Sequence, residues 1–555
     1  MNPIKFITHP IFLLTFLAFL TVIPFFNTRF FYTQDYIFIA RLSQISAALL
    51  DGQFPVRWAP DLRFGEPVFN FYAALPYYLG ALIHLLGFNI IWVAKILFIL
   101  SAFLSALAIY VFTRKFFSTK AAIFAAILYI YAPYRAVDTY VRGTLSENWA
   151  FVFFPLIFYT SALLAEKISL ARIAFLSLSL AGLFLTHNVT TLMFLPFLGL
   201  WWLFLIFKNG NIFSRESINI EFSFIFSFLL GIGVSAFFLL PAFFERKFIQ
   251  TEYLTVGYFD FRAHFIALKQ FFSTFWGYGS SLWGLDDGIS FQIGLAHWLV
   301  ILLAVITGFI NRNNRKLLML LFFLGVSFLL SLFLQHNKSA PIWEAIPLMA
   351  FIQFPWRFLA VSIFIVSITG AVVIDSFLNK SKYLYLLLIG LVIAVNFSYF
   401  KPKDYVDDSF FAKFLDKDIM HKGIDLTKDY LPIWVETVDV DYFDKPRSQE
   451  GEIEVLESQR RSDYLKAKTA VKSDNSIIEL PITYFPGWEV KLDNKLISQL
   501  EPSVGGLIRI ELPKGVYNIE ARFNNTPIRL VGNSLTVASL LLVTFFLGYT
   551  RYKLK

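Results

Sequence analysis

The chain has no cysteine among its 555 residues. Disulfide bonds and thiolate metal sites are therefore excluded. Its seven histidines are scattered, without the spacing of a zinc site. Charged residues make up only 16% of the chain and are almost absent from the middle of its long apolar runs. A secondary transporter would be expected to carry charged groups near the middle of the membrane, so this distribution speaks against that class.

Most of the chain is apolar: 57% of the residues are hydrophobic and the mean hydropathy is +0.62. Apolar runs recur that are long enough for a helical span, which needs about 20 residues. These runs are continuous and do not alternate with polar residues, which predicts a polytopic α-helical membrane protein. The first run, 10–26, has no small-residue cleavage site after it and is predicted to be a retained span and not a signal peptide.

The formal net charge of +9 comes from short basic clusters between the apolar runs. This is the positive-inside pattern of a membrane protein, and no nucleic-acid partner is expected. Between the clusters at Lys5 and Arg114 lie three apolar stretches, 10–26, 71–87 and 89–113. Three crossings would put the two clusters on opposite sides. The stretch 71–87 is therefore predicted to be an interfacial helix on the outer face.

This topology gives about 12 spans in the plasma (inner) membrane, with both termini cytoplasmic. The predicted divisions are a transmembrane domain over 1–399 with its first outer loop at 28–88, an extracytoplasmic domain over 400–528, and a last span with a cytoplasmic tail over 529–555. From about residue 450 the hydropathy alternates with period two, as in "GVYNIEARF". Turn residues separate these segments, which predicts a β-sandwich.

Asp35 follows the first span in an aromatic and apolar context. A partly desolvated acid at the membrane surface could act as a general base or bind a metal ion. The alternative is that Asp35 caps the helix that follows it.

Four arginines of the predicted outer loops are candidates to hold a phosphate: Arg57, Arg63, Arg142 and Arg357. Arginine recognises phosphate with two parallel hydrogen bonds. Anchoring to lipid headgroups is the alternative reading of Arg57 and Arg63.

Acids, amides and aromatic residues also gather in these loops. Such residues suit a sugar, whose hydroxyl groups need acceptors and whose ring faces pack on aromatic rings. The candidates for a sugar or acceptor site are Asp138, Glu147, His187, Asn188, Glu252, Trp276, Asp286, Asp287 and Trp356.

Several motifs together resemble a known family over nearly the whole chain. They are "DGQFPVRWAPDLRFGEPVFNFYAALPYYLG", "YVRGTLSENWAFVFFPL", "THNVTTL", "WGYGSSLWGLDDGISFQIG", "QFPWRFL", "YFPGWEVKLDNK" and "LPKGVYNIEARF". The chain resembles bacterial membrane proteins named for a 6-pyruvoyl-tetrahydropterin-synthase-related domain. It also resembles the GT-C superfamily of membrane glycosyltransferases. The clustered zinc-binding histidines of the soluble pterin synthases have no counterpart here.

The resemblance to GT-C enzymes implies a polyprenyl-phosphate-linked sugar as donor and an essential acid in the first outer loop, which Asp35 matches. Many GT-C members carry a second acid there, whereas Gln34 precedes Asp35 in this chain. The resemblance therefore leaves open whether a divalent cation, Mg or Mn, takes part.

Together with these residues, the resemblance implies an integral-membrane glycosyltransferase that transfers a sugar, with inversion, to a glycan or other cell-surface acceptor. A non-catalytic or transport protein that handles lipid-linked glycans is the second hypothesis. A membrane anchor for the outer β-domain is the third.

Overall fold

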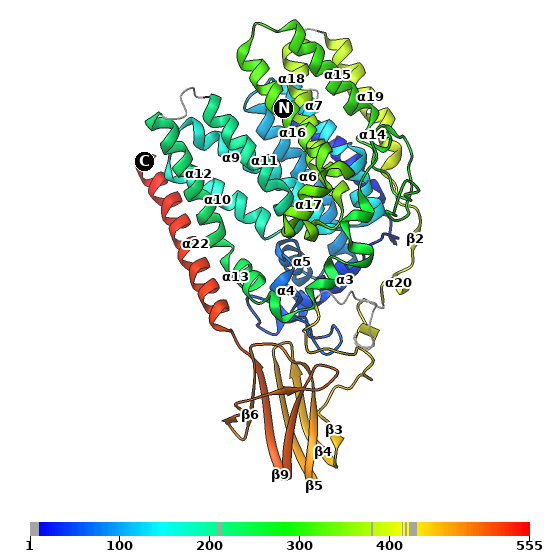
Figure 1. The fold of residues 1–555 in the computed structure, drawn as a ribbon, viewed down its shortest axis with the longest axis vertical. Coiled ribbons are helices and arrows are strands. Elements are labelled where there is room, and N and C mark those ends of the chain that lie inside the picture. Colours follow the sequence, from blue (N-terminus) through cyan, green and yellow to red (C-terminus); the bar gives the residue numbers. More distant parts are fainter. Residues whose placement is uncertain are drawn as a thin grey trace.

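The computed structural model describes residues 10–208, 214–378, 381–412, 414–416, 419–420 and 430–554. A body of helices forms most of the molecule, and an antiparallel β-sheet projects from one end of it (Figure 1). Lys5, the first of the basic clusters that predict the topology, lies outside the described residues. The predicted fold class, a polytopic helical membrane protein with a β-domain near the C-terminus, is confirmed.

The helices of the first part of the chain are α2 (Pro10–Val22), α3 (Ile37–Leu50), α4 (Val68–Phe71), α5 (Leu75–Leu85), α6 (Ile90–Arg114), α7 (Thr119–Ile130), α8 (Pro133–Ala136), a π-helix (Val137–Arg142), α9 (Leu145–Glu166), α10 (Leu170–Phe184), α11 (Asn188–Lys208), α12 (Arg215–Val234) and α13 (Ala236–Phe244). Those of the second part are α14 (Leu268–Phe272), α15 (Leu295–Ile310), α16 (Arg315–Gln335), α17 (Ala340–Ala345), α18 (Leu359–Val373), α19 (Lys382–Asn396), α20 (Asp408–Ala412) and α22 (Pro527–Leu554).

Eight helices of the described ranges are long and apolar enough to cross a membrane: α6, α9, α11, α12, α16, the helix through α18, α19 and α22. A ninth span results if α7 and the segment Pro133–Arg142, bent by 46°, cross together. Five further apolar helices are shorter, with 10–17 residues. The predicted total of about 12 spans needs some of these shorter helices to cross as well, and it stays a prediction.

Helix α5 forms from the stretch that we predict to lie on the outer face. Its 11 residues give a length of about 16 Å at 1.5 Å per residue, about half of the hydrocarbon core of a bilayer. It packs against α3 and α6, near the β-sheet end of the helical body (Figure 1). Leu82, Leu85 and Leu86 remain exposed and can contact lipid. This geometry supports an interfacial position.

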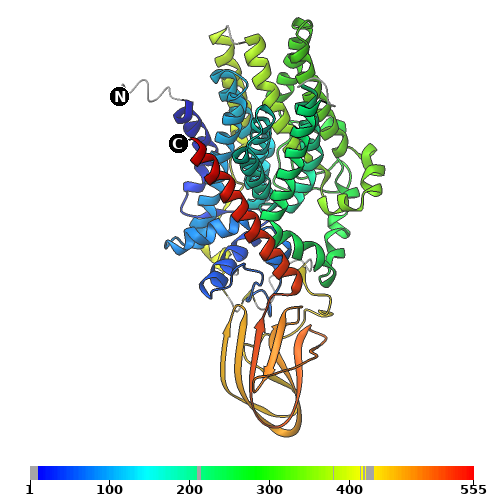
Figure 2. The same cartoon turned by 90° about the vertical axis from the view of Figure 1, so that its left-hand side faces the viewer.

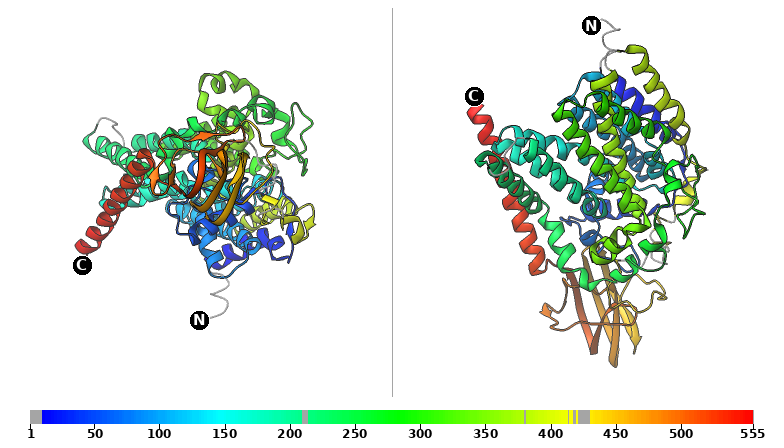
Figure 3. Two further views of the ribbon diagram at one scale, coloured as in Figure 1. Left: turned by 90° about the horizontal axis from the view of Figure 1, so that it is seen from below. Right: turned by 45° about the horizontal axis from the view of Figure 1, so that its top comes forward.

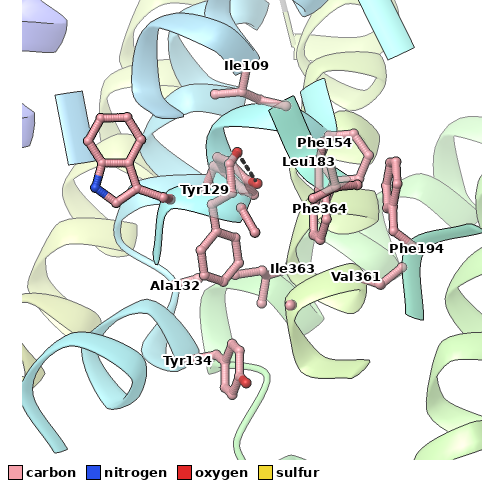
Figure 4. Packing of buried hydrophobic residues seen from close by; sticks show 14 of the residues in the cluster. Ile109, Tyr129, Ala132, Tyr134, Phe154, Leu183, Phe194, Val361, Ile363 and Phe364 are labelled. Atoms are coloured by element: carbon pink, nitrogen blue, oxygen red, sulfur yellow. Dashed lines mark hydrogen bonds between the residues drawn. The ribbon is translucent and has the colours of Figure 1, made fainter. Parts of the chain in front are cut away.

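Aromatic side chains fill the centre of the helical body. Every residue of α18 is buried, which is why the segment is apolar on all sides. Phe154 of α9 stacks on Phe194 of α11 with ring centroids 4.2 Å apart, and Phe364 of α18 lies against both rings (Figure 4). The phenylalanine-rich composition therefore supplies the packing between the central helices.

The β-domain consists of β3 (Arg447–Glu450), β4 (Ile453–Arg461), β5 (Tyr464–Thr483), β6 (Trp488–Leu492), β7 (Lys495–Leu496), β8 (Glu501–Pro502) and β9 (Leu507–Phe523). All seven strands join one antiparallel sheet in the order β3-β5-β9-β6-β7, with β4 on β5 and β8 on β9. The alternation in β9 buries Ile519 and Ala521 while Asn518 and Arg522 stay exposed.

The sheet folds back on itself at the long strands β5 and β9. Their register shifts between Val471 and Asn475. Both ends of β5 bond to the 51–64 segment: Ser462, just before the strand, donates its N–H to Asp51 Oδ2, and Thr483, its last residue, donates its N–H to Phe64 O. Residues from both halves share one hydrophobic cluster. The continuous sheet thus encloses its core in two layers, as in a sandwich.

Two connections join the β-domain to the helical body. Strand β2 (Tyr405–Val406) pairs antiparallel with β1 (Phe30–Phe31), so the segment after α19 lies beside the chain that leads to Asp35. After β9, helix α22 runs from the sheet along the helical body toward its far end (Figure 2). Figure 3 shows the same path from two other directions: the strands lie in front of the helices in the left view and below them in the right view.

Candidate active site

A cavity of about 1010 Å³ is lined by residues that are far apart in the sequence. They come from the segments around α3, α4, the start of α9, the α10–α11 turn and the chain before α18. Half of the predicted site residues are among them: Asp35, Arg142, Glu147, His187, Asn188, Trp356 and Arg357. The cavity therefore combines acids, arginines, a histidine and an indole ring.

Asp35 lies at the edge of this cavity, just before α3. Its Oδ1 accepts a hydrogen bond of 3.0 Å from the N–H of Ile37, the first residue of α3. In the described part of the chain its Oδ2 makes no hydrogen bond. Desolvation raises the pKa of the Asp35 carboxyl, although the positive charges of Arg41 and Arg142 oppose this shift. The carboxyl thus contributes to the start of α3 and also has an oxygen available to the cavity.

The backbone around Asp35 is fixed by the π-helix Val137–Arg142. The N–H of Gln34 donates to Val141 O at 2.9 Å, and the N–H of Asp35 donates to Arg142 O at 2.8 Å. Gly143 ends the π-helix with φ +73°, and a Cβ there would lie 2.5 Å from Thr33 Oγ1. Glycine is required at this position because the two segments approach so closely. A π-helix is often found at a functional site.

Arg142 lies in a buried ionic cluster at the wall of the cavity. Its Nη1 donates to Asp138 Oδ1 at 2.5 Å and to Glu147 Oε2 at 2.8 Å. Asp138 is itself held by Thr144 and by Asn148. The guanidinium carbon of Arg142 lies 4.6 Å from the ring centre of Trp356. Asp138 is fully buried, so its role in this structure is to hold Arg142.

Arg357 faces the same carboxylate from the start of the α18 span. Its Nε lies 3.9 Å from Glu147 Oε2, and its Nη1 donates to Ile352 O at 2.8 Å. Glu147 therefore lies between two arginines: Arg142, which is also paired with Asp138, and Arg357. Arg41 is a third cavity arginine, on the second turn of α3. Arg41 is not among the predicted site residues, although no base lies closer to Asp35 in the chain.

His187 and Asn188 form the turn between α10 and α11. His187 Nδ1 lies 2.6 Å from Thr190 Oγ1. Burial lowers the pKa of His187 to about 3, and the charge of Arg357 adds to this lowering while Glu147 opposes it. The imidazole is therefore neutral near pH 7, and can form a hydrogen bond to a neutral hydroxyl group. Asn188 donates its side-chain N–H to Phe71 O at 2.8 Å.

Arg57 and Arg63 lie elsewhere, although both were candidates for a phosphate. Arg57 donates to Asn70 Oδ1 at 3.0 Å and to Asn533 Oδ1 of α22 at 2.8 Å, which ties it to the junction with the last helix. Arg63 has a backbone φ of 54° and is not among the residues that line the cavity.

The remaining candidates belong to the 246–290 segment. Glu252 is exposed on a short 3₁₀ turn. Trp276 stacks on Tyr399 with ring centroids 4.5 Å apart. Asp286 and Asp287 line a second cavity of about 590 Å³. Asp287 accepts from Leu282 N and from Gln270 Nε2, so it also stabilises its own loop.

The described residues of the cavity form no preassembled site for a divalent cation. Within the described ranges, no group of three histidine, aspartate or glutamate side chains could hold a metal ion. Both oxygens of Glu147 accept hydrogen bonds, from Tyr134 and from Arg142.

The sequence profile of the 6-pyruvoyl-tetrahydropterin synthase related domain, a membrane protein family, matches residues 69–402. The fold and this match define a polytopic membrane protein that belongs to that family. An uncharacterized protein of Lactococcus lactis subsp. cremoris (strain MG1363) is 30% identical over 237 residues. The aligned region is 41% of this chain and 38% of that relative, so it spans less than half of the relative's length.

Three solved structures show a distant likeness. Arabinofuranosyltransferase AftD from Mycobacteria has a TM-score of 0.45 and 13% identity, covering 71% of this chain and 27% of that chain. ArnT from Cupriavidus metallidurans, bound to undecaprenyl phosphate, has a TM-score of 0.39 and 14% identity, covering 69% and 63%. The Archaeoglobus fulgidus oligosaccharyltransferase has a TM-score of 0.40 and 13% identity, covering 72% and 57%. The residues of the cavity, and not these similarities, support the function proposed below.

Proposed function

We propose that this protein is an integral-membrane glycosyltransferase that transfers a sugar from a polyprenyl-phosphate donor to a glycan or other cell-surface acceptor. The cavity is the observation that carries the proposal. It places Asp35, whose pKa is raised, together with Arg142 and Arg357. A membrane anchor for the β-domain would not need an acid with a raised pKa in a cavity beside two arginines.

The charges around the cavity favour an anionic ligand. Five arginines and three carboxylates lie in or directly behind the cavity wall: Arg41, Arg135, Arg142, Arg246, Arg357, Asp35, Asp138 and Glu147. The arginines therefore outnumber the carboxylates by two. A phosphodiester carries one negative charge and can accept several N–H groups, so the donor would offset part of this positive excess. Arg142 and Arg357 would hold its phosphate.

One side of the cavity is apolar and suits the polyprenyl chain. Val189 and Leu192 of α11 line it together with Leu348 and Phe351. Most of the exposed lining is apolar, as expected for a pocket that binds a lipid and orients it with a few polar groups.

Asp35 would act as the general base. The acceptor hydroxyl oxygen attacks the anomeric carbon, and its proton passes to the Asp35 carboxylate. The bond between the anomeric carbon and the phosphate oxygen breaks, and polyprenyl phosphate leaves. One displacement without a covalent intermediate inverts the anomeric configuration. General-base assistance of this kind contributes about 10²–10⁴-fold to the rate.

The acceptor would approach from the 246–290 segment. Gln34 Nε2 donates to Gly279 O at 2.6 Å, so this segment lies directly beside Asp35. Asp286 and Asp287 of the second cavity, with Trp276 nearby in the chain, would contact the hydroxyl groups and ring faces of a glycan.

The test is transfer by the purified protein in proteoliposomes. With a panel of radiolabelled polyprenyl-phosphate sugars and cell-envelope glycans, we expect label to move to the glycan and unlabelled polyprenyl phosphate to be released. Vesicles without the protein are the control. If no donor of the panel loses its sugar although the protein binds polyprenyl phosphate, the protein only handles the lipid and the proposal is wrong.

The proposed orientation places residues 28–88 and 400–528 outside the cell and both termini in the cytoplasm. Phe54 is 76% exposed and Lys495 lies on an exposed hairpin strand, and the chain has no cysteine of its own. We expect Phe54→Cys and Lys495→Cys to react with an impermeant maleimide on intact cells. Arg312→Cys, in a basic loop, should react only after permeabilisation. Labelling of just one of the first two would contradict this topology.

A further inference from the structure

Three consecutive residues, Asn70, Phe71 and Tyr72, connect the β-domain to the candidate active site. Asn70 is fully buried and donates its Nδ2 hydrogen to Glu245 Oε2 at 2.7 Å. Glu245 is paired with Arg529 at 2.9 Å. Arg529 in turn donates to Pro486 O of the β-domain at 2.8 Å. The position of Asn70 is therefore fixed by the junction between the helical body and the sheet.

Phe71 contacts the β-domain directly. It belongs to the hydrophobic cluster that forms the core of the sheet, together with Trp58. Its ring lies 6.2 Å from that of Phe485, edge to face. The same residue lines the large cavity, and its carbonyl oxygen accepts the hydrogen bond from Asn188. The β-domain therefore supports one wall of the cavity.

Tyr72 lies under the side chain of Arg41. The guanidinium carbon of Arg41 is 3.9 Å from the centre of the Tyr72 ring, and Arg41 is 7% exposed. Arg41 also lines the cavity and is close enough to Asp35 to lower the pKa of that carboxyl. A cation over an aromatic face is held in place more strongly when both groups are desolvated. An arginine side chain normally loses conformational entropy when it binds a ligand. Because Arg41 is already held in one position, this cost is smaller when the ligand binds.

We infer that Arg41 is a third ligand of the donor phosphate, that Tyr72 is a residue that positions it, and that the β-domain holds Tyr72 in place through Phe71. This inference rests on the proposed function, because it assigns an anionic lipid to the cavity. It gives the β-domain a role in donor binding: without the contact between Phe71 and Phe485, the ring beneath Arg41 shifts and the arginine loses its fixed position.

The test is binding of undecaprenyl phosphate to the full-length protein in detergent, with Kd measured by calorimetry. Arg41→Met should raise Kd about tenfold, as expected for a charge-assisted phosphate contact. Tyr72→Leu should raise Kd by a similar factor, whereas Tyr72→Phe, which keeps the ring, should bind as the wild type does. Tyr72→Leu should cause no further loss when Arg41 is already replaced, because the two side chains act through one contact.

The contribution of the β-domain is tested with Phe485→Ala. Phe485→Ala should raise Kd in the wild-type background. It should not change Kd further in a variant that already carries Arg41→Met. Val471→Ala is the matched control, since Val471 is buried in the same cluster but lies at the far bend of the sheet. It should leave Kd unchanged, and thermal unfolding confirms that each variant is folded. A Phe71→Leu variant replaces Phe485→Ala if the latter does not fold.

The outcomes separate the two proposals. Wild-type protein that does not bind undecaprenyl phosphate contradicts the proposed function and this inference with it. Wild-type binding that is unaffected by Arg41→Met removes Arg41 from the site and leaves the proposed function standing. Weaker binding by Arg41→Met together with full binding by Tyr72→Leu shows that Tyr72 does not position Arg41. Equal losses in Tyr72→Phe and Tyr72→Leu contradict a role for the ring.

Discussion

Asp35→Asn should lower kcat about 10²–10⁴-fold and leave the affinity for the donor nearly unchanged. The amide keeps the shape of the side chain and can still accept the hydrogen bond from Ile37 N. It cannot take the proton of the acceptor hydroxyl. If Asp35 only stabilises the start of α3, asparagine serves that purpose equally well and activity should persist. The substitution thus separates catalysis from helix capping.

The pH dependence of the transfer rate is a second test of the role of Asp35. A general base works only when ionised, so the wild-type rate should fall as the pH drops through the pKa of Asp35. Because desolvation raises this pKa, the fall should begin above the usual range of an aspartate. The residual rate of Asp35→Asn should lack this acidic limb. Asp493→Asn, on an exposed turn of the β-domain, is the control and should behave as the wild type. Full activity in Asp35→Asn would refute the mechanism.

Arg529→Met should destabilise the protein by about 3–5 kcal/mol, the range for a buried ion pair that loses one partner. Arg529 is 0% exposed and Glu245 is 2% exposed. Without the arginine, the Glu245 carboxylate stays buried, and its hydrogen-bond donors among the described residues are the neutral groups of Asn70 and Thr526. The contact of Arg529 with Pro486 O is lost at the same time. The free energy of unfolding in detergent, from denaturant titration, measures the loss.

Two further variants show that burial causes the effect. Arg529→Met combined with Glu245→Gln should recover part of the lost stability, because no unpaired charge remains. Arg509→Met removes a pair with Glu501 in which Arg509 is half-buried and Glu501 is exposed, and it should cost no more than about 1 kcal/mol. Equal losses in Arg529→Met and Arg509→Met would mean that the junction does not depend on the buried pair.

The sequence predicted the elements well because each depends on a local pattern. Continuous apolar runs became helices such as α6 and α16, and the alternating segment "GVYNIEARF" became the end of β9. The internal proline and tyrosines of 71–87 marked a weak span, and this stretch holds the 11-residue helix α5. Arg142 and Arg357 share a cavity with Asp35, since all three lie next to helix ends on one side of the helical body.

The partners of individual side chains could not be predicted in the same way. Arg57 lies in a motif that predicts a phosphate site. In the structure its side chain instead donates a hydrogen bond to Asn533 of the last helix, α22. No local pattern indicates that contact. For Arg41 the sequence indicates no functional role, because it is an ordinary residue of a predicted helix. Only the fold shows that Tyr72 lies beneath it. Long-range packing decides which arginines reach the cavity.

The anomeric configuration of the transferred sugar tests the proposed chemistry most directly. The purified protein is given a polyprenyl-phosphate sugar of known configuration, and the linkage in the first product formed is determined by NMR. One base, Asp35, and a single displacement predict that the configuration is inverted. A product with retained configuration would require a second carboxylate to act as a nucleophile on the sugar, and would contradict the single-displacement mechanism at Asp35.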